Sequence, residues 1–303
     1  MKGLAISGGS TKISFLSSVA TELMKRNDYE VITGISAGSI IALLIAIKDY
    51  DILENAIMNT TEDDFFEVKP TKDNGKISLK AVFRVISGKQ SLGKYSLDKL
   101  LKKYYTPEQH ERMKNSGKIV KIGAVNLNLV RIEYCDITKV DYETAIKWVV
   151  ASSSIPIATE TVKIGEYYYI DGGSLEHVGG IAALEAGSKS LDVIFSRPEK
   201  IELTESDVEW TPKSVLGVML RTITVMSRNT TIENESEIKL ACFQKNIPLN
   251  IYYTPFALTT SLYKMDKDLS RAWFELGKQM ILNPDAEHEY HNNLEEPKAG
   301  MDK

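Results

Sequence analysis

The feature that most constrains this chain is the segment from Gly34 to Gly38, a G-x-S-x-G pattern with Ser36 at its centre. An apolar run ends just before it at Thr33, and a helix-like apolar run begins just after it at Ser39. A strand that turns sharply into a helix exposes the central serine hydroxyl at the top of the turn. The two glycines let backbone segments approach without a Cβ between them. We predict that Ser36 is a catalytic nucleophile; the alternative is a serine that caps the helix.

Length and composition set the broad class. The chain has 303 residues, 43% of them hydrophobic, and a net charge of −4, which suits one large globular domain or two small ones. Cys135 and Cys242 lie far apart in the sequence, and neither has metal-ligand spacing. The first strand begins almost at Met1, without a signal segment, and no apolar run is long enough to span a bilayer. We expect a soluble, cytoplasmic protein that needs no metal or other cofactor.

The order of apolar runs predicts an α/β fold. Strand-like runs that end in Gly or Ser alternate with helix-like runs through most of the chain, which favours a mostly parallel central sheet with helices on both faces. The runs 119–125 and 129–134 are joined by only three residues, which indicates a β-hairpin. The sheet is therefore expected to be mixed.

A basic segment interrupts this pattern. Residues 69–121 hold 14 Lys and Arg against 4 Asp and Glu. We interpret residues 69–118 as a helical insertion over one edge of the sheet. Basic residues are attracted to anionic membrane surfaces, so this segment predicts peripheral membrane contact. The alternative is a solvated helical face, balanced by the acidic residues 62–64 and Glu67.

The C-terminal third divides into two parts. Residues 214–228 have the apolar spacing of a helix, either packed on the core or acting as an interfacial lid. The tail 283–303 is polar, and we expect it to be disordered.

A serine hydroxyl needs a base that takes its proton. Asp171 follows the strand-like run 167–170 and precedes Gly172 and Gly173, which permit a tight turn. In open α/β sheets the site lies at the carboxyl ends of the strands, where we expect both Ser36 and Asp171. Alternatively, Asp171 serves only as a turn residue. Among the four histidines, His177 is the one near a plausible sheet edge.

Residues 7–12 end the first strand and open the first helix. Their successive amide groups, together with the amide of Ala37, are suited to bind the oxyanion of a tetrahedral intermediate. A phosphate-binding glycine loop is a weaker interpretation, because neither full glycine motif of such loops is present.

These segments, in this order, resemble the patatin-like phospholipase family over residues 2–198. The resemblance implies a three-layer sandwich with Ser36 as nucleophile and Asp171 as its base. It further implies an oxyanion hole at Gly8, Gly9, Ser10 and Ala37, supported by Lys12, Gly34, Gly38, Gly172 and Gly173. Residues 151–156 resemble the family's A-S-x-x-x-P segment, which packs beside the site.

Two positions depart from the family pattern. Ser10 stands where the family has a third glycine, and Ile13 replaces another glycine. The oxyanion hole then depends on Ser10 keeping a negative φ.

The resemblance implies a metal-free lipid acyl hydrolase, of phospholipase A or lysophospholipase type, with a lipid substrate and no nucleic-acid partner. Two alternatives remain: an acyltransferase with His177 as base, and a catalytically weak lipid-binding or regulatory protein. We expect a catalytic domain at 1–200 and a helical extension at 201–282 that packs on it or caps it.

Overall fold

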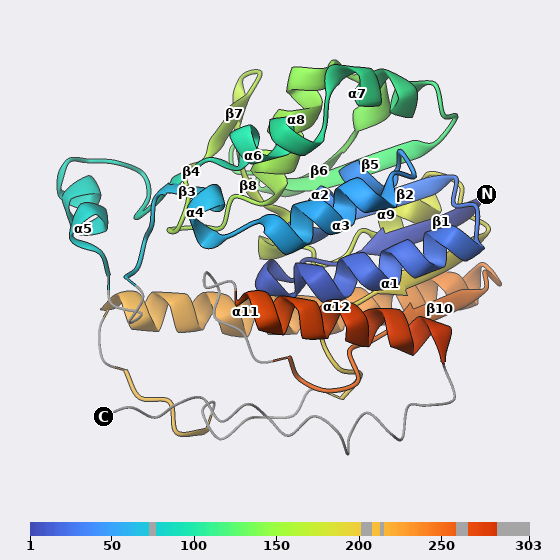
Figure 1. The fold of residues 1–303 in the computed structure, drawn as a ribbon. Coiled ribbons are helices and arrows are strands. Elements are labelled where there is room, and N and C mark those ends of the chain that lie inside the picture. Colours follow the sequence, from blue (N-terminus) through green and yellow to red (C-terminus); the bar gives the residue numbers. More distant parts are fainter. Residues whose placement is uncertain (73–76, 201–207, 213–214, 259–265, 284–303) are drawn as a thin grey trace.

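The computed structural model describes residues 1–72, 77–200, 208–212, 215–258 and 266–283. One eight-stranded sheet forms its centre, in the order β10-β9-β1-β2-β5-β8-β7, with β6 paired to the outer edge of β5 (Figure 1). The strands are β1 (Lys2–Ile6), β2 (Val31–Ile35), β5 (Ile119–Asn126), β6 (Arg131–Asp136), β7 (Val162–Ile164), β8 (Tyr167–Asp171), β9 (Ser190–Ile194) and β10 (Leu249–Tyr252). The pairings among β10, β9, β1, β2 and β5 are parallel, whereas β6, β7 and β8 pair antiparallel. The mixed, mostly parallel sheet is confirmed, as is the hairpin of β5 and β6.

Helices cover both faces of the sheet (Figure 1). One face carries α1 (Ile13–Arg26), α2 (Ala37–Ile45) and α8 (Tyr142–Ser152), and α12 (Lys267–Leu282) packs on α1. The other face carries α9 (Gly180–Glu185) and part of α11 (Val215–Gln244). The remaining helices are α3 (Tyr50–Asn59), α4 (Glu62–Phe65), α5 (Leu79–Ile86), α6 (Leu97–Tyr104) and α7 (Pro107–Lys114).

The alternation of side chains along the strands creates two cores. In β1, Leu4 and Ile6 point into the larger core beneath α1 and α2, whereas Ala5 points into the smaller core beneath α9 and α11. Almost every residue of α1 is buried, because this helix lies between the sheet layer on one side and α12 on the other. Two of the buried polar side chains of α1 bond to the helix backbone: the Ser17 hydroxyl donates to the Ser14 carbonyl and the Ser18 hydroxyl to the Phe15 carbonyl.

The first part of the basic segment extends beyond the carboxyl ends of the parallel strands (Figure 1). A separate two-stranded sheet of β3 (Phe66–Val68) and β4 (Lys94–Tyr95) brackets α5, which stands away from the body (Figure 1). The helices α6 and α7 follow and return the chain to β5.

The C-terminal segment differs from expectation in two ways. The expected helical extension over 201–282 contains α11 and α12, but also β10, which extends the main sheet beside β9. The core-packing interpretation of residues 214–228 is wrong for Val218, Met219 and Met226, whose side chains are exposed. The contacts of α11 with the core come from its second half, through Ile238 and Cys242. The predicted disordered tail lies, apart from Asn283, outside the described residues.

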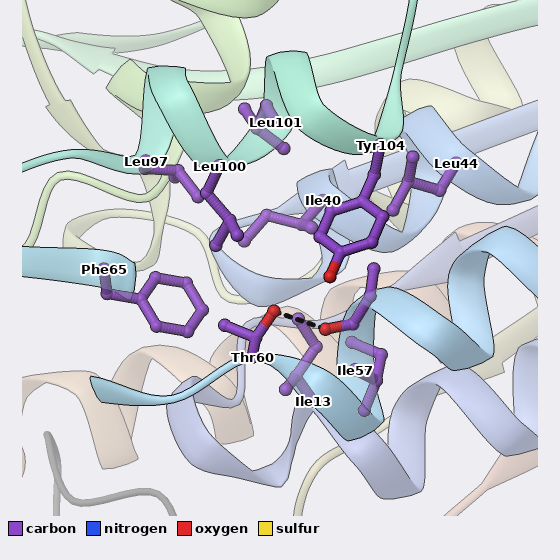
Figure 2. A pocket seen from close by; sticks show the side chains of 11 residues that line it. Ile13, Ile40, Leu44, Ile57, Thr60, Phe65, Leu97, Leu100, Leu101 and Tyr104 are labelled. Carbon is purple, nitrogen blue, oxygen red and sulfur yellow. Dashed lines mark hydrogen bonds between the residues drawn. The ribbon is translucent and has the colours of Figure 1, made fainter. Parts of the chain in front are cut away.

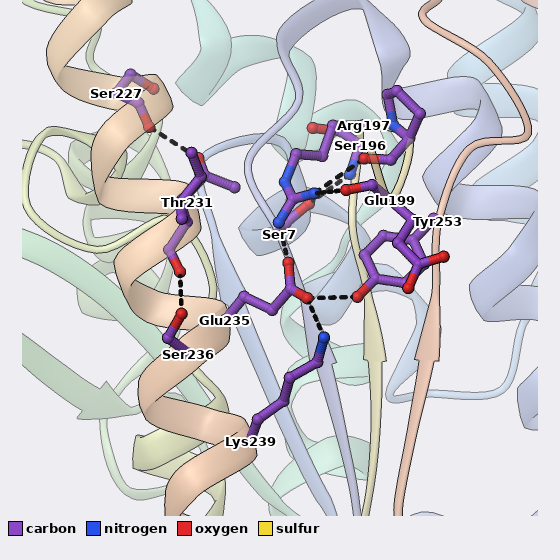
Figure 3. Close-up of polar contacts among 12 residues, drawn as sticks. Ser7, Ser196, Arg197, Glu199, Ser227, Thr231, Glu235, Ser236, Lys239 and Tyr253 are labelled. Carbon is purple, nitrogen blue, oxygen red and sulfur yellow. Dashed lines mark hydrogen bonds and ion pairs between the residues drawn. The ribbon is translucent and has the colours of Figure 1, made fainter. Parts of the chain in front are cut away.

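A polar cluster fastens the middle of α11 to the edge of the sheet (Figure 3). Glu235 accepts a hydrogen bond of 2.6 Å from the Tyr253 hydroxyl, and its carboxylate pairs with Arg197 and Lys239. The Arg197 guanidinium also lies over the rings of Phe195 and Tyr253. Charge-assisted hydrogen bonds of this kind fix orientation as well as adding stability.

The contact of α12 with α1 gives a stability prediction. A Cβ on Gly277 would lie 2.8 Å from the Phe15 carbonyl oxygen and closer still to Ser18 Oγ. We expect Gly277→Ala to lower the free energy of unfolding by about 1–2 kcal/mol, because overpacking outweighs the better helix propensity of alanine. Denaturant unfolding measures the change, and Glu275→Ala on the exposed side of α12 is the control. A more stable Gly277→Ala variant would contradict the close packing of these helices.

Candidate active site

Ser36 and Asp171 meet at one point on the edge of β5. β2 pairs with the first half of β5 and ends with Ile35 opposite Gly123. β8 arrives from the other direction along the same edge and ends with Asp171 opposite Ala124. Two strands that end opposite adjacent residues bring their terminal side chains together. Ser36 Oγ donates a hydrogen bond of 2.7 Å to Asp171 Oδ2.

The turn at Ser36 has the geometry of a strained nucleophile elbow. Ser36 has φ of 54° and ψ of −124°, a backbone conformation that residues with a Cβ rarely adopt. A Cβ on Gly34 would lie 2.6 Å from the Gly38 carbonyl carbon, and a Cβ on Gly38 would lie 2.7 Å from the Ser7 carbonyl oxygen. Both glycines are therefore required by close backbone approach.

Serine hydroxyls from the end of α8 and from the first turn of α2 hold the turn at Ser36 in place. The Ser36 amide donates to Ser152 Oγ at 2.9 Å, and the Ser152 hydroxyl donates to the Gly123 carbonyl at 2.6 Å. Ser153 Oγ and Ser39 Oγ donate to the Ser36 carbonyl at 3.1 and 2.6 Å. Sequence reasoning placed residues 151–156 beside the site but gave no role to these hydroxyls. The run of three serines after a helix was the available signal.

The environment of Asp171 suits a proton acceptor. Its side chain is only 6% exposed, and this burial raises the pKa of the carboxyl to about 6, against the lowering effect of hydrogen bonds from Ser36 and Gly173. The Gly173 amide donates to Asp171 Oδ1 at 2.7 Å, and Gly172 packs against the Gly123 carbonyl. At neutral pH the carboxylate is therefore mostly ionised and oriented by both of its oxygens.

The opening loop lies directly against the nucleophile. A Cβ on Gly8 would be 3.2 Å from Ser36 Cβ. Ser196 Oγ donates to the Gly8 carbonyl at 2.6 Å, and Lys12 Nζ donates to the Ser196 carbonyl at 3.0 Å. The Gly8 amide donates to the His177 carbonyl at 3.0 Å, so this predicted oxyanion donor already has an acceptor.

Ser10 adopts a left-handed conformation, with φ of 47°. The condition of a negative φ at this position, set by the side chain of Ser10, is therefore not met. The chain must turn at Ser10 from Gly9 into a short 3-10 turn (Ser10–Lys12) that leads into α1, and a glycine would make this turn without strain. The predicted oxyanion roles of Gly9, Ser10 and Ala37 stay predictions; Ala37 is the first residue of α2, next to Ser36.

His177 is held as a neutral residue beside the loop. Burial, followed by the positive charges of Lys12 and Arg197, lowers the pKa of its imidazole to about 4. Its amide donates to Asn234 Oδ1 on α11, and its carbonyl accepts the bond from Gly8. Within the described part of the chain, no hydrogen bond joins its ring to Ser36, and its Nδ1 is buried without a partner. The geometry favours Asp171 over His177 as the base.

Two adjoining cavities lead away from Ser36. The first, of about 60 Å³, is lined by Ser36, Ala37 and Ser10 on one side and by Phe66, Tyr95 and Ile155 on the other. The second, of about 20 Å³, lies deeper and is almost wholly apolar (Figure 2). Both are lined by Ile13, Ile40 and Phe65, and the deeper one ends among leucines and Tyr104. The apolar lining of both cavities suits contact with part of a hydrocarbon chain, although their volumes are smaller than that of a typical ligand pocket.

Burial of the Asp171 carboxyl predicts a pH-dependent stability difference. Its folded pKa of about 6 exceeds the ordinary aspartate pKa of 3.8, so the stability that the protonated group contributes is present below pH 3.8 and is lost as pH rises through about 6. We expect Asp171→Asn to unfold with a free energy up to about 3 kcal/mol higher than wild type at about pH 8, with no gain near pH 4.

Denaturant unfolding at both pH values tests this, with Asp98→Asn on the surface of α6 as the control for general pH effects. A variant less stable than wild type at the higher pH would contradict the argument.

Comparisons with known proteins gave a structural match and a match to a family model. Among solved structures, VipD from Legionella pneumophila is similar with a TM-score of 0.46 and 11% sequence identity, and the match covers 93% of this chain but only 66% of VipD. No curated protein matches the sequence. A family model, described as patatin-like phospholipase, matches residues 4–179. This match covers more than half of the chain and includes the segments of both Ser36 and Asp171, so the protein belongs to the patatin-like phospholipase family.

Proposed function

We propose that this protein is a lipid acyl hydrolase, of phospholipase A or lysophospholipase type, that works through an acyl-Ser36 intermediate with Asp171 as the base. Membership of the family implies lipid acyl hydrolysis in general terms. The observation that carries the finer proposal is the 2.7 Å hydrogen bond between Ser36 Oγ and Asp171 Oδ2 at a strained elbow.

The reaction would proceed in two halves. Asp171 takes the hydroxyl proton while Ser36 Oγ attacks the ester carbonyl carbon, and amides of the opening loop and of Ala37 stabilise the oxyanion. The tetrahedral intermediate collapses, the leaving alcohol takes the proton from Asp171, and the acyl group stays on Ser36. A water molecule then attacks the acyl-enzyme, giving its proton to Asp171 and releasing the fatty acid. The serine oxygen recovers that proton.

The two alternatives make different demands. An acyltransferase with His177 as base needs that ring to reach Ser36, and no such hydrogen bond joins the two in the described residues. The alternative of a lipid-binding protein without catalysis rests on the departures from the family pattern at Ser10 and Ile13. The left-handed conformation of Ser10 is a further observation in its favour. Neither alternative explains why a carboxylate is buried against the hydroxyl of Ser36.

Membrane contact through the basic segment 69–121 stays a prediction. Several of its ammonium groups already have carboxylate partners: Lys69 pairs with Asp63, and both Lys94 and Lys99 pair with Glu67. The charge that remains for anionic headgroups is smaller than the sequence total indicates. Within the described residues, no helix is long and apolar enough to cross a membrane.

The first activity prediction concerns the dyad. Ser36→Ala should abolish labelling by a fluorophosphonate probe and lower ester hydrolysis by at least about 1000-fold, because the nucleophile is lost. Asp171→Asn should also lose most activity, whereas His177→Ala should stay within about tenfold of wild type. Labelling and hydrolysis are measured on all three variants. Loss of activity in His177→Ala alone would reject the dyad, and the absence of labelling in wild type with added lipid would favour the binding-protein alternative.

The second activity prediction concerns the acyl chain. Ile40 lines both cavities, so Ile40→Phe should narrow the passage between them. We expect the rate ratio of hexadecanoyl to butanoyl nitrophenyl esters to fall by about tenfold or more, because the long chain loses its pocket. Ile40→Val, which leaves the passage open, is the matched control. An unchanged ratio in Ile40→Phe would show that the chain binds elsewhere.

A further inference from the structure

The helix α5 exposes a continuous apolar surface to solvent. The side chains of Leu79, Phe83 and Ile86 are 76%, 70% and 78% exposed, and Val82 and Val85 are exposed as well. Large apolar side chains that gather on one short helix are unusual on a protein surface and mark an interaction site. Figure 1 shows this helix standing away from the body at one end of the molecule.

The orientation of α5 is fixed by its other face. Ala81 is buried, and Arg84 pairs with Glu160 at 2.6 Å and donates to Ser91. Ser78 caps the first turn through the Ala81 amide. The apolar side chains consequently point away from the body and are not available to its core.

Along the chain, the charged residues that flank α5 are basic, and the carboxylate that reaches the helix is Glu160, which is paired with Arg84. The sequence contains no Asp or Glu between Asp73 and Asp98. Lys80 and Lys89 are exposed, and no carboxylate of the described residues pairs with them, in contrast to Lys94 and Lys99. Apolar residues flanked by free lysines match the chemistry of a phospholipid surface, with its acyl region beneath phosphate headgroups.

The attachment of α5 leads directly to the cavity above Ser36. The helix is inserted between β3 and β4, and Phe66 of β3 and Tyr95 of β4 line that cavity. After the helix, the amides of Leu92 and Gly93 donate to the carbonyls of Ile157 and Ala158, in the loop that contributes Ile155 to the same wall. A surface bound by α5 would therefore lie next to the entrance of the candidate active site.

We propose that the apolar face of α5 inserts into the interfacial layer of a phospholipid membrane, with Lys80 and Lys89 at the headgroups. Its use in bringing substrate to Ser36 rests on the proposed hydrolase function, whereas the binding itself does not. Because apolar insertion dominates, binding extends to zwitterionic membranes and persists at high salt.

Flotation with phosphatidylcholine vesicles tests the proposal. Wild type and the catalytically inactive Ser36→Ala variant are expected to float with the vesicles in low and high salt. Phe83→Ser/Ile86→Ser is expected to lower the partition coefficient by tenfold or more, because two apolar anchors are lost. Phe243→Ser is the matched control: Phe243 is 84% exposed, and it lies at the C-terminal end of α11, at the opposite end of the molecule from α5 (Figure 1).

A second readout follows the helix itself. Phe83→Trp should bind vesicles as wild type does and show an additional blue shift of tryptophan emission when they are added. Hydrolysis of the butanoyl ester should be unchanged in the double variant, which separates this inference from the proposed function. If no ester is hydrolysed by any form but the flotation pattern holds, α5 is a membrane anchor and the hydrolase proposal fails.

Three results would overturn the proposal. One is equal flotation of wild type and the double variant, and another is no flotation of wild type at all. The third is binding only to anionic vesicles that is lost in high salt, which would assign membrane contact to the lysines and arginines of segment 69–121 and not to the apolar face of α5. If wild type does not bind vesicles but forms dimers, and the double variant is a monomer, the partner of the apolar face of α5 is a second copy of the chain.

Discussion

The candidate active site depends on the pairing of two strands, β2 and β8, with successive parts of the same edge of β5. β2 runs parallel to its first half and β8 antiparallel to its second half, so the two strands end opposite the adjacent residues Gly123 and Ala124. In a fully parallel sheet, the carboxyl ends of two neighbouring strands would lie at the same side of the sheet. Their backbones would then be one strand spacing apart, about 4.8 Å. The reversal at β8 instead brings a serine and a carboxylate into hydrogen-bonding contact. The mixed sheet is thus a condition for the contact between Ser36 and Asp171.

This junction concentrates unfavourable local energies. Ser36 and Ser10 both have positive φ, and the Asp171 carboxyl is buried with a raised pKa. At Ser36 the surrounding contacts stabilise the strained backbone. Gly34 and Gly38 permit the close approach of the chain, and hydroxyls at the end of α8 form hydrogen bonds with the Ser36 amide and carbonyl. Strain held by a rigid frame is typical of functional sites. The same frame keeps the Ser36 hydroxyl within hydrogen-bonding distance of Asp171.

The sequence predicted what short motifs determine, and missed what distant contacts determine. The alternating runs and the hairpin follow from local periodicity, and the elbow follows from five consecutive residues. The left-handed conformation of Ser10 could not be predicted from the neighbouring residues, because it results from the position at which α1 must begin. Nor could the bond from the Gly8 amide to His177, which joins residues from opposite halves of the chain. The strand β10 is short and follows a long helix, and only pairing with β9 makes it a strand.

Charge shows most clearly how tertiary structure changes the meaning of composition. Summed along the sequence, residues 69–121 form one strongly basic segment. In the fold, Lys94 and Lys99 both pair with Glu67, and Arg84 pairs with Glu160. Part of the positive charge is therefore neutralised by ion pairs within the protein. What distinguishes α5 is therefore the combination of free lysines with apolar side chains that have no core to enter. The membrane contact that we propose for α5 rests on this combination, because a bilayer interface likewise changes from polar to apolar over a short distance.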